Sequence, residues 1–499
     1  MRIVIKGLSD ERFHRPLVNI ANLFEEDSEV LFDQHALDEG LVMELGWKED
    51  HGVVEAVGHI ADSDVRSRFT REMPDGLNEK ERWKQLKNAV LSVYLNLLQE
   101  YTGITQKWGI LTGIRPTKLL HKLLREGMEK EEAHAALKRD YLIHDEKINL
   151  MQEIVDRQLQ AIPDLYDLQQ EVSVYIGIPF CPTKCAYCTF PAYAIKGQAG
   201  RVETFLFGLH YEMQKIGSWL KEQGIKVTTV YFGGGTPTSI TAEEMDLLYE
   251  EMYRSFPDVK HIREITVEAG RPDTITPDKL EVLNRYNIDR ISINPQSYEN
   301  ETLKAIGRHH SVEETIEKYH LSRQYGMNNI NMDLIIGLPG EGLKEFQHSL
   351  HQTEELKPES LTVHTLSFKR ASEMTRNKEK YQVADREEII QMMDEAVKWT
   401  KAHQYHPYYL YRQKNILGNL ENIGYSLEGQ ESLYNIIIME EVQTIIGIGC
   451  GAASKFIDPR SGKITQYANP KDPKSYNDRY EHYTEEKINF LESLFVSHE

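Results

Sequence analysis

Residues 176–190 read IGIPFCPTKCAYCTF and contain three of the four cysteines in a chain of 499 residues. Cys181, Cys185 and Cys188 stand at C-x3-C-x2-C spacing. Three clustered cysteines in a chain that is otherwise poor in cysteine indicate thiolate ligands or a redox group, not a disulfide framework. The apolar run at 172–178 predicts a buried β-strand. The cysteines are therefore expected on the loop at the carboxyl end of that strand.

Three interpretations of this cysteine loop are compatible with its spacing. A structural zinc site needs four ligands, and no fourth Cys or His lies nearby, since the next His is His210. A thioredoxin-like redox pair needs only C-x2-C and leaves Cys181 without a role. A [4Fe-4S] cluster can be held by three thiolates, with one iron open to a further ligand. Spacing alone leaves all three open.

Downstream of the cysteine loop, apolar segments alternate with helix start signals. Thr241 and Glu244 form a capping box, and Pro277 stands at the first position of the next predicted helix. This alternation predicts an α/β fold with a parallel sheet, arranged as an incomplete TIM-like (β/α)6 barrel. The six predicted strands are residues 172–178, 227–233, 263–269, 289–294, 329–337 and 360–366.

The length and the pattern changes predict three domains. Residues 1–165 are expected to form an α+β and helical N-terminal domain of unknown role, with a hairpin over 41–60 and helices from about 78 to 160. A linker is expected at 161–170. Residues 166–400 are expected to form the core barrel, and 401–499 a small C-terminal domain.

Bulk composition excludes several classes of partner. The net charge of -20 repels the nucleic-acid backbone, so no nucleic-acid partner is expected. The sequence shows no signal peptide and no 18-residue apolar segment, so no membrane insertion is expected. The chain is expected to reside in the cytoplasm.

Polar residues recur at the ends of the predicted strands. In a barrel of parallel strands the active site forms at the carboxyl ends. A carboxylate buried there without a partner is costly, which favours a functional role for the acidic members. These positions are the glycine-rich stretch 232–238 (FGGGTPT), Glu268, Gln296, Asp333, His364 and Ser367.

The longer motifs resemble those of a known family. YIGIPFCPTKCAYCTF, YFGGGTPT, TVEAGRPDTI, INPQSYENETLKAIGRHH and NMDLIIGLPG occur in order between residues 175 and 340. The cysteine loop followed by GGGTPT is similar to the radical S-adenosylmethionine (SAM) superfamily, and the full series resembles its oxygen-independent coproporphyrinogen III oxidase (dehydrogenase) family. The resemblance implies a [4Fe-4S] cluster whose open iron binds SAM, and a second bound SAM.

The resemblance also implies roles for individual residues. Cys181, Cys185 and Cys188 would hold the cluster, and Tyr175, Gly234 and Glu268 would contact the cluster-bound SAM. Contacts to the second SAM would come from a larger set of residues. These are Tyr187, Gly235, Thr236, Gln296, Arg308, Asp333 and Ser367.

The implied enzyme is a radical SAM oxidoreductase of porphyrin and haem biosynthesis. It would convert two propionate groups of coproporphyrinogen III to vinyl groups, giving protoporphyrinogen IX through a 5'-deoxyadenosyl radical. Its partners would be this tetrapyrrole and an electron donor such as a flavodoxin or ferredoxin system.

An alternative function is haem trafficking by a family member without porphyrinogen turnover. Phe190 stands where the oxidising enzymes can carry a further cysteine, and C-x-Y-C-x-F is commoner in the trafficking branch. However, that branch tends to carry H-N-x-x-Y-W near the C-terminus, where this chain has SLYNIIIMEE at 432–441.

Other residues are expected to be structural. Cys450 is predicted to be a small buried hydrophobic residue. His309 and His310 are expected at the surface, and the aromatic segment 405–412 in the core and at its rim.

Overall fold

The structure is a computed structural model that describes residues 1–32, 40–190, 192–197, 199–367, 372–377, 380–414 and 416–496. The chain divides into two compact units, Met1–Val155 and Asp156–Glu499. One five-stranded sheet belongs to the first unit, and an eleven-stranded sheet and a two-stranded sheet belong to the second.

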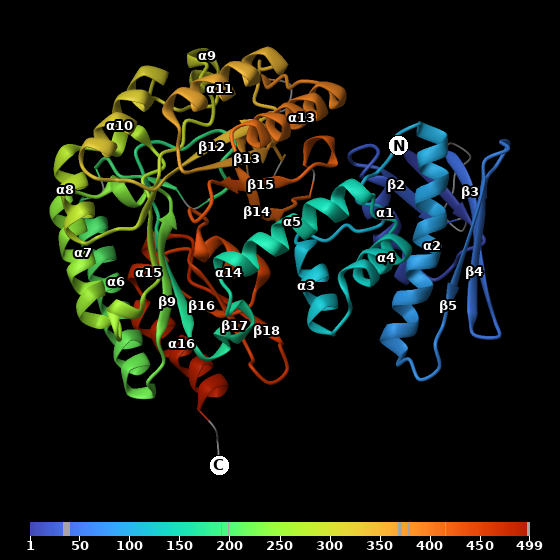
Figure 1. Cartoon of the computed structure of the whole chain (residues 1–499), viewed down its shortest axis with the longest axis horizontal. Coiled ribbons are helices and arrows are strands. Elements are labelled where there is room, and N and C mark those ends of the chain that lie inside the picture. The colour runs from blue at the N-terminus through green and yellow to red at the C-terminus, as the bar shows by residue number, and fades with distance from the viewer. Residues whose placement is uncertain are drawn as a thin grey trace. The chain divides into compact units, whose positions relative to one another are not determined.

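The first unit is built on the sheet β2-β1-β3-β4-β5, in which β1 is parallel to both of its neighbours. The predicted hairpin over 41–60 is confirmed by the antiparallel pair β3 and β4. Helices α1 and α2 bury their apolar residues with one face of this sheet, and α2 begins with a capping box between Asn78 and Glu81 (Figure 1). The elements are β1 (Arg2–Lys6), α1 (His14–Ala21), β2 (Glu29–Phe32), β3 (Leu41–Asp50), β4 (Val53–Ile60), β5 (Arg66–Glu72), α2 (Glu79–Thr102), α3 (Thr117–Arg125), α4 (Lys130–Tyr141) and α5 (Asp145–Ala161).

The segment between the N-terminal elements and the barrel is packed, so the predicted linker at 161–170 is wrong. Residues Leu165–Gln170 form a 3-10 helix in which Leu165 and Leu168 are buried. They join a core with Tyr408, Ile437 and Ile445. The boundary between the two units falls earlier, within α5.

The second unit contains the predicted parallel strands. All six predicted strands are present and neighbour one another in chain order, each parallel to the next, which confirms the (β/α)6 arrangement. Because they are parallel, their carboxyl ends meet at one edge. They are β6 (Val172–Ile178), β9 (Val227–Gly234), β10 (Glu264–Glu268), β11 (Arg290–Ser292), β12 (Ile330–Ile336) and β13 (Ser360–Thr365).

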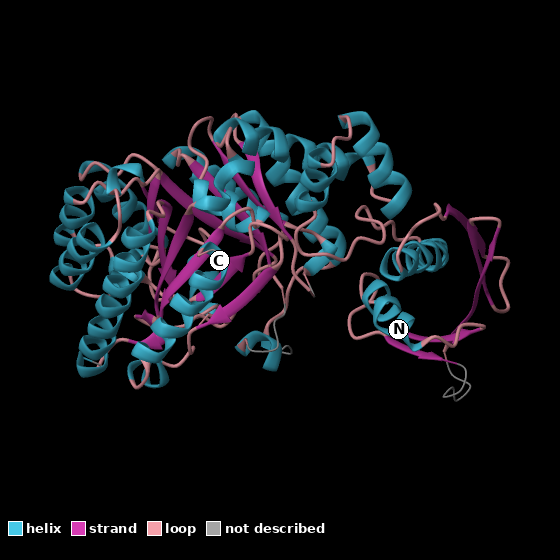
Figure 2. Ribbon diagram, turned by 90° about the horizontal axis from the view of Figure 1, so that it is seen from below, coloured by secondary structure: helices cyan, strands magenta, loops and turns pink. Residues whose placement is uncertain are grey.

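Helices that connect the parallel strands lie along the outer side of this curved sheet (Figure 2), whereas the helix Leu433–Glu440 packs Tyr434 against Tyr175 and Tyr231 on its inner side. The predicted capping box is confirmed at the start of α7, where Thr241 and Glu244 exchange side-chain and backbone hydrogen bonds. The helices are α6 (Ala199–Gln223), α7 (Ala242–Ser255), α8 (Pro277–Arg285), α9 (Asn300–Ala305), α10 (Val312–Gln324), α11 (Leu343–Leu356), α12 (Glu373–Arg376), α13 (Arg386–Ala402), α14 (Leu433–Glu440), α15 (Pro473–Asn477) and α16 (Tyr480–Phe495).

Residues after 400 extend the sheet of the barrel at both of its edges. β15 pairs antiparallel with β13 and with β14, while β16 pairs parallel with β6. Residues 401–499 therefore share one sheet with the core, and Asp156–Glu499 is one compact unit. The added strands are β14 (His406–Tyr411), β15 (Asn422–Ser426), β16 (Thr444–Gly449), β17 (Ala453–Ile457) and β18 (Ile464–Ala468), and β7 (Phe180–Cys181) and β8 (Tyr193–Ala194) form the two-stranded sheet.

Candidate cofactor site

The glycine run at the end of β9 packs against the end of β6. The N–H of Gly235 donates to the carbonyl of Ile178 at 2.7 Å, and that of Thr236 to the carbonyl of Phe180 at 2.7 Å. Gly234 has φ of 107°, and a Cβ on it would lie 2.9 Å from the Ile178 carbonyl oxygen. Only glycine tolerates both conditions, so this backbone can approach a bound group closely.

The cysteine loop is held by contacts at several points. Cys181 and Cys185 are buried, and the Sγ of Cys181 lies 3.2 Å from the Oγ1 of Thr236. The N–H of Ala186 donates to the carbonyl of Ile306 at 2.9 Å, which ties the loop to the turn after α9. Burial raises the pKa of the Cys181 thiol to about 11. Binding of a metal group at this sulfur would therefore release a proton.

A zinc site would need ligands that converge on one ion. Among the residues that the structure describes, no three His, Cys, Asp or Glu side chains are placed to hold a single metal ion.

Two buried guanidinium groups contact the cysteine loop, Arg308 from the loop after α9 and Arg271 from the loop after β10. Arg308 donates to the Tyr187 hydroxyl at 3.2 Å and approaches the Sγ of Cys185 at 3.9 Å. Arg271, in the loop after β10, donates to the side chain of Thr183 at 3.0 Å and is paired with Asp273 at 2.8 Å. Positive charge at these positions favours added negative charge on the loop.

Gln296 carries an unsatisfied group into the same region. Its φ of 67° is left-handed, which is uncommon for a residue with a side chain, and its N–H donates to the carbonyl of Asp333 at 2.9 Å. Its Oε1 is buried and has no hydrogen-bond partner among the described residues. A buried acceptor of this kind fits a site that gains a donor from a ligand.

Glu268, at the end of β10, faces a stack of three tyrosines. The hydroxyl of Tyr231 donates to its Oε1 at 2.5 Å, and the Tyr231 ring stacks on Tyr434 with ring centroids 4.4 Å apart. Tyr175 stacks on both rings, at 6.0 Å and 6.3 Å. Burial raises the pKa of Glu268 to about 7, against the opposing effect of the Tyr231 hydrogen bond. Glu268 can therefore gain or lose a proton near neutral pH.

Asp333, on β12, behaves differently from Glu268. Burial would raise its pKa, but His364, Asn331 and Thr362 favour its charged form and hold the pKa below the usual value. Asn331 donates to it at 2.7 Å. The barrel interior thus holds one carboxyl that stays ionised and another that titrates near neutrality, a pattern typical of functional sites.

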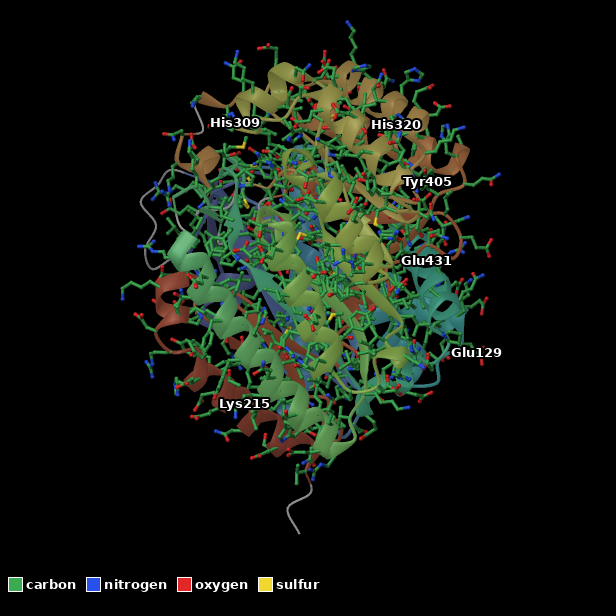
Figure 3. All side chains as sticks on the ribbon, turned by 90° about the vertical axis from the view of Figure 1, so that its left-hand side faces the viewer. Glu129, Lys215, His309, His320, Tyr405 and Glu431 are labelled. Atoms are coloured by element: carbon green, nitrogen blue, oxygen red, sulfur yellow. The ribbon has the colours of Figure 1, made fainter. Side chains whose placement is uncertain are left out.

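Most of the predicted site residues are brought together by these contacts, but Ser367 is not joined to the others. Its hydroxyl donates to the carbonyl of Lys414 at 2.7 Å. Cys450 is buried as expected, and its thiol donates to the carbonyl of Pro470 at 3.2 Å. The surface expectation holds for His309, labelled in Figure 3, and is wrong for His310, which is 3% exposed.

Several residues at the site were not among those predicted. Tyr231 lies within the quoted motif YFGGGTPT, and side-chain alternation along β9 could have indicated that it faces inward. Arg271 lies in TVEAGRPDTI, and nothing in the neighbouring sequence predicts that this Arg is buried beside the cysteine loop. Tyr434 comes from the C-terminal segment, whose position depends on tertiary pairing.

Comparison with known proteins agrees with this geometry. Residues 175–353 match the model of the Radical SAM superfamily. The oxygen-independent coproporphyrinogen-III oxidase-like protein HemZ of Bacillus subtilis is 74% identical over 99% of both chains. The heme chaperone HemW of the same species is 30% identical over 65% of this chain and 82% of its own length. The structure of coproporphyrinogen III oxidase HemN from Escherichia coli is similar in fold, with a TM-score of 0.51 at 20% identity, over 65% of this chain and 72% of that one.

The barrel, its three-cysteine loop and these matches define a radical SAM protein, a class that uses a [4Fe-4S] cluster and SAM. Within that superfamily, the chain belongs to the oxygen-independent coproporphyrinogen-III oxidase-like family of haem metabolism. The helices of the described part of the chain include none that is both long and apolar enough to cross a membrane.

Proposed function

We propose that this protein catalyses the oxygen-independent oxidative decarboxylation of coproporphyrinogen III propionates to vinyl groups. The observation that carries the proposal is the 74% identity to an oxidase-like relative over nearly the whole of both chains. The site supports it, because the cysteine loop, the glycine cradle and the unpaired Gln296 acceptor fit the cofactors of the class.

The proposal assigns the cluster to Cys181, Cys185 and Cys188. Bound together, the cluster and SAM would supply a 5'-deoxyadenosyl radical that takes a hydrogen atom from a propionate. Arg271 and Arg308 hold the cysteine loop in place and supply positive charge beside it.

The remaining predicted residues are proposed to orient SAM. Gly234 lets backbone approach the ligand, while Tyr175 and Glu268 provide an aromatic face and an acceptor for ribose hydroxyls. Gln296, Arg308 and Asp333 are proposed to contact a second SAM. Tyr187, Gly235, Thr236 and Ser367 are proposed to complete that second set.

Recognition of the substrate carboxylates is proposed to use exposed basic residues near the cysteine loop. Lys184 lies within that loop, and its carbonyl oxygen would lie 3.7 Å from a Cβ placed on Gly307. His309 lies two residues after Gly307 and is exposed. Both can therefore reach a carboxylate at the surface of this region.

The proposed reaction balances with named products. For each propionate, SAM and one electron from the donor would give methionine and 5'-deoxyadenosine, which carries one hydrogen atom of the substrate. CO2 would leave from the carboxylate, and one electron would pass to a one-electron acceptor. A low-potential donor such as a flavodoxin or ferredoxin is proposed to reduce the cluster. Anaerobic incubation of reconstituted protein with SAM, reductant and coproporphyrinogen III should give CO2 and vinyl products. Cleavage of SAM without either product would refute the substrate assignment.

A second candidate function, haem trafficking, is favoured by the HemW relative and by Phe190, whose side chain is 59% exposed. A large exposed aromatic residue beside the cysteine loop could contact a haem plane. Stoichiometric haem binding, together with SAM cleavage that does not respond to porphyrinogen, would support this function instead.

A further inference from the structure

Three polar side chains from three strands lie in a row inside the barrel, each in contact with the next. The hydroxyl of Tyr411 on β14 lies 3.2 Å from the Nδ1 of His364 on β13. The Nε2 of His364 lies 3.3 Å from the Oδ2 of Asp333 on β12. The Asp333 and His364 side chains keep 17% and 25% of their surface exposed, so both can be reached by a small ligand.

The glycine at position 424 lets tyrosines of β14 reach across the strand that separates it from β13. β15 lies between the two strands, and its Gly424 pairs with both Thr362 and Tyr409. A Cβ on Gly424 would lie only 1.8 Å from the Tyr409 ring. The Tyr409 hydroxyl lies 3.2 Å from Thr362 on β13, and the Tyr411 ring stacks on Tyr409 with an interplanar angle of 8°. A side chain at position 424 would occupy the space of the Tyr409 ring, on which Tyr411 stacks.

The two partners of His364 indicate where the hydrogens on its ring nitrogens lie. An ionised carboxylate only accepts hydrogen bonds, so the Nε2 of His364 carries the hydrogen that faces Asp333. When the ring is a neutral imidazole in that tautomer, its Nδ1 is an acceptor and the Tyr411 hydroxyl donates to it. Hydrogen-bond donation in this tautomer runs from Tyr411 through His364 to Asp333.

The contacts among Tyr411, His364 and Asp333 fix the orientation of the Asp333 carboxylate and leave an acceptor site on it for a ligand. Its Oδ1 accepts from Asn331 at 2.7 Å and its Oδ2 faces His364. Each carboxylate oxygen can accept two hydrogen bonds, so at least one acceptor site is left beyond the contacts with Asn331, His364 and Thr362. The low pKa of Asp333 agrees with a carboxylate that these neighbours keep charged.

We infer that His364 and Tyr411 are positioning residues that hold the Asp333 carboxylate for a hydroxyl or ammonium group of the second SAM. This inference rests on the proposed function, which places that ligand at Asp333. It makes β14, a strand of the C-terminal segment, part of the cofactor site. Partners that orient metal-ligating side chains change metal affinity by about 10-fold to 100-fold when removed, and we expect an effect near the lower end of that range for SAM.

The test measures SAM binding by equilibrium dialysis on the anaerobically reconstituted full chain. Wild type should bind two equivalents of SAM. His364→Phe should weaken the second equivalent about tenfold, whereas His364→Gln, whose amide N–H can replace the Nε2 donor, should stay within about threefold of wild type. The affinity of Tyr411→Phe for the second equivalent of SAM should lie between those of His364→Phe and His364→Gln. Tyr405→Phe is the matched control, because it removes a tyrosine hydroxyl that donates to the Pro358 carbonyl and does not contact Asp333, His364 or Tyr411, and it should bind as wild type.

A second readout needs no cofactor turnover. In the ¹⁵N spectrum of histidine-labelled protein, the resonances of His364 are identified by their loss in His364→Gln. They should show a protonated Nε2 and an unprotonated Nδ1, and Tyr411→Phe should shift the Nδ1 resonance while Tyr405→Phe should not. The opposite tautomer would overturn the inference.

Two-equivalent SAM binding by wild type that His364→Phe leaves unchanged would overturn the inference and leave the proposed function intact. Equal weakening by His364→Gln and His364→Phe would also overturn it, because side-chain volume would then be the cause. Absence of SAM cleavage and product in wild type would instead refute the proposed function.

Discussion

The hydroxyl of Tyr231 donates a 2.5 Å hydrogen bond to Oε1 of Glu268, and it joins the glycine-rich strand β9 to the proposed ribose-binding carboxylate. Burial raises the pKa of Glu268 to about 7, while this hydrogen bond favours the ionised form. SAM affinity should therefore rise with pH as Glu268 becomes ionised, by about tenfold between pH 6 and pH 8. Tyr231→Phe should move the midpoint of this rise to higher pH, and Glu268→Gln should remove it. Calorimetric titration over this range provides the measurement, and a rise of equal size in Glu268→Gln would contradict the assignment.

The cysteine loop gives the sharpest prediction about metal content. Cys185→Ala should lose the cluster and all SAM cleavage, because a cluster with an open iron has no spare thiolate. Cys450→Ala is the control, since Cys450 is buried elsewhere and its thiol bonds to the Pro470 carbonyl. Iron and sulfide analysis after anaerobic purification compares the two variants. Wild-type iron content or retained SAM cleavage in Cys185→Ala would disprove this site.

Arg271 should control how firmly the cluster is held and how easily it is reduced. Arg271→Gln removes the bond to Thr183 and a buried positive charge beside the loop. The cluster should be lost to a chelator several-fold faster, and its midpoint potential should fall by on the order of 50 mV. Arg263→Gln, which changes a surface arginine paired with Asp164, should behave as wild type. If the midpoint potential of the cluster and its rate of loss to a chelator are unchanged in Arg271→Gln, Arg271 does not have this role.

Lys184 should contribute to recognition of an anionic substrate. Lys184→Glu should raise KM for coproporphyrinogen III several-fold and make it depend more weakly on salt, while SAM affinity stays unchanged. Lys215→Glu serves as the control, because Lys215 is an exposed residue of α6 that is labelled far from His309 in Figure 3. Steady-state kinetics at two salt concentrations test this, and an equal effect of both variants would argue for general charge alone.

A buried ion pair under the C-terminal glycine turn should matter for stability. Lys487 contacts Glu212 and donates to the Gly447 carbonyl at 2.9 Å, with both charged side chains fully buried. Lys487→Met leaves a buried carboxylate without its cation, so the free energy of unfolding should fall by about 3–5 kcal/mol. Lys474→Met, in an exposed pair with Asp478, should change it by less than about 1 kcal/mol. Urea titration measures both, and similar effects of the two substitutions would contradict the importance of burial.

The parallel strands and the cysteine loop could be predicted from the sequence because their signals are local. Each strand of the barrel is a short apolar run, and the helix after β9 begins with the capping box of Thr241 and Glu244. The cysteine spacing and GGGTPT are likewise continuous motifs. Their meeting at one sheet edge then follows from the parallel arrangement alone.

The position of the C-terminal strands could not be predicted in the same way. β16 pairs with β6, about 270 residues away, and β15 pairs with β13 although α12, α13 and β14 lie between them in the sequence. Such pairings depend on edges that exist only after the barrel has formed. The roles of Tyr411 and Tyr434 follow from these pairings, so the aromatic segment 405–412 could be assigned only to the core and its rim.

The central claim is that a propionate of coproporphyrinogen III loses a hydrogen atom to the SAM-derived radical. The most direct measurement uses substrate deuterated at the propionate carbon next to the ring, with mass spectrometry of 5'-deoxyadenosine and tetrapyrrole after an anaerobic reaction. The account predicts one deuterium in 5'-deoxyadenosine for each propionate that becomes a vinyl group. Unlabelled 5'-deoxyadenosine together with unchanged tetrapyrrole would contradict it.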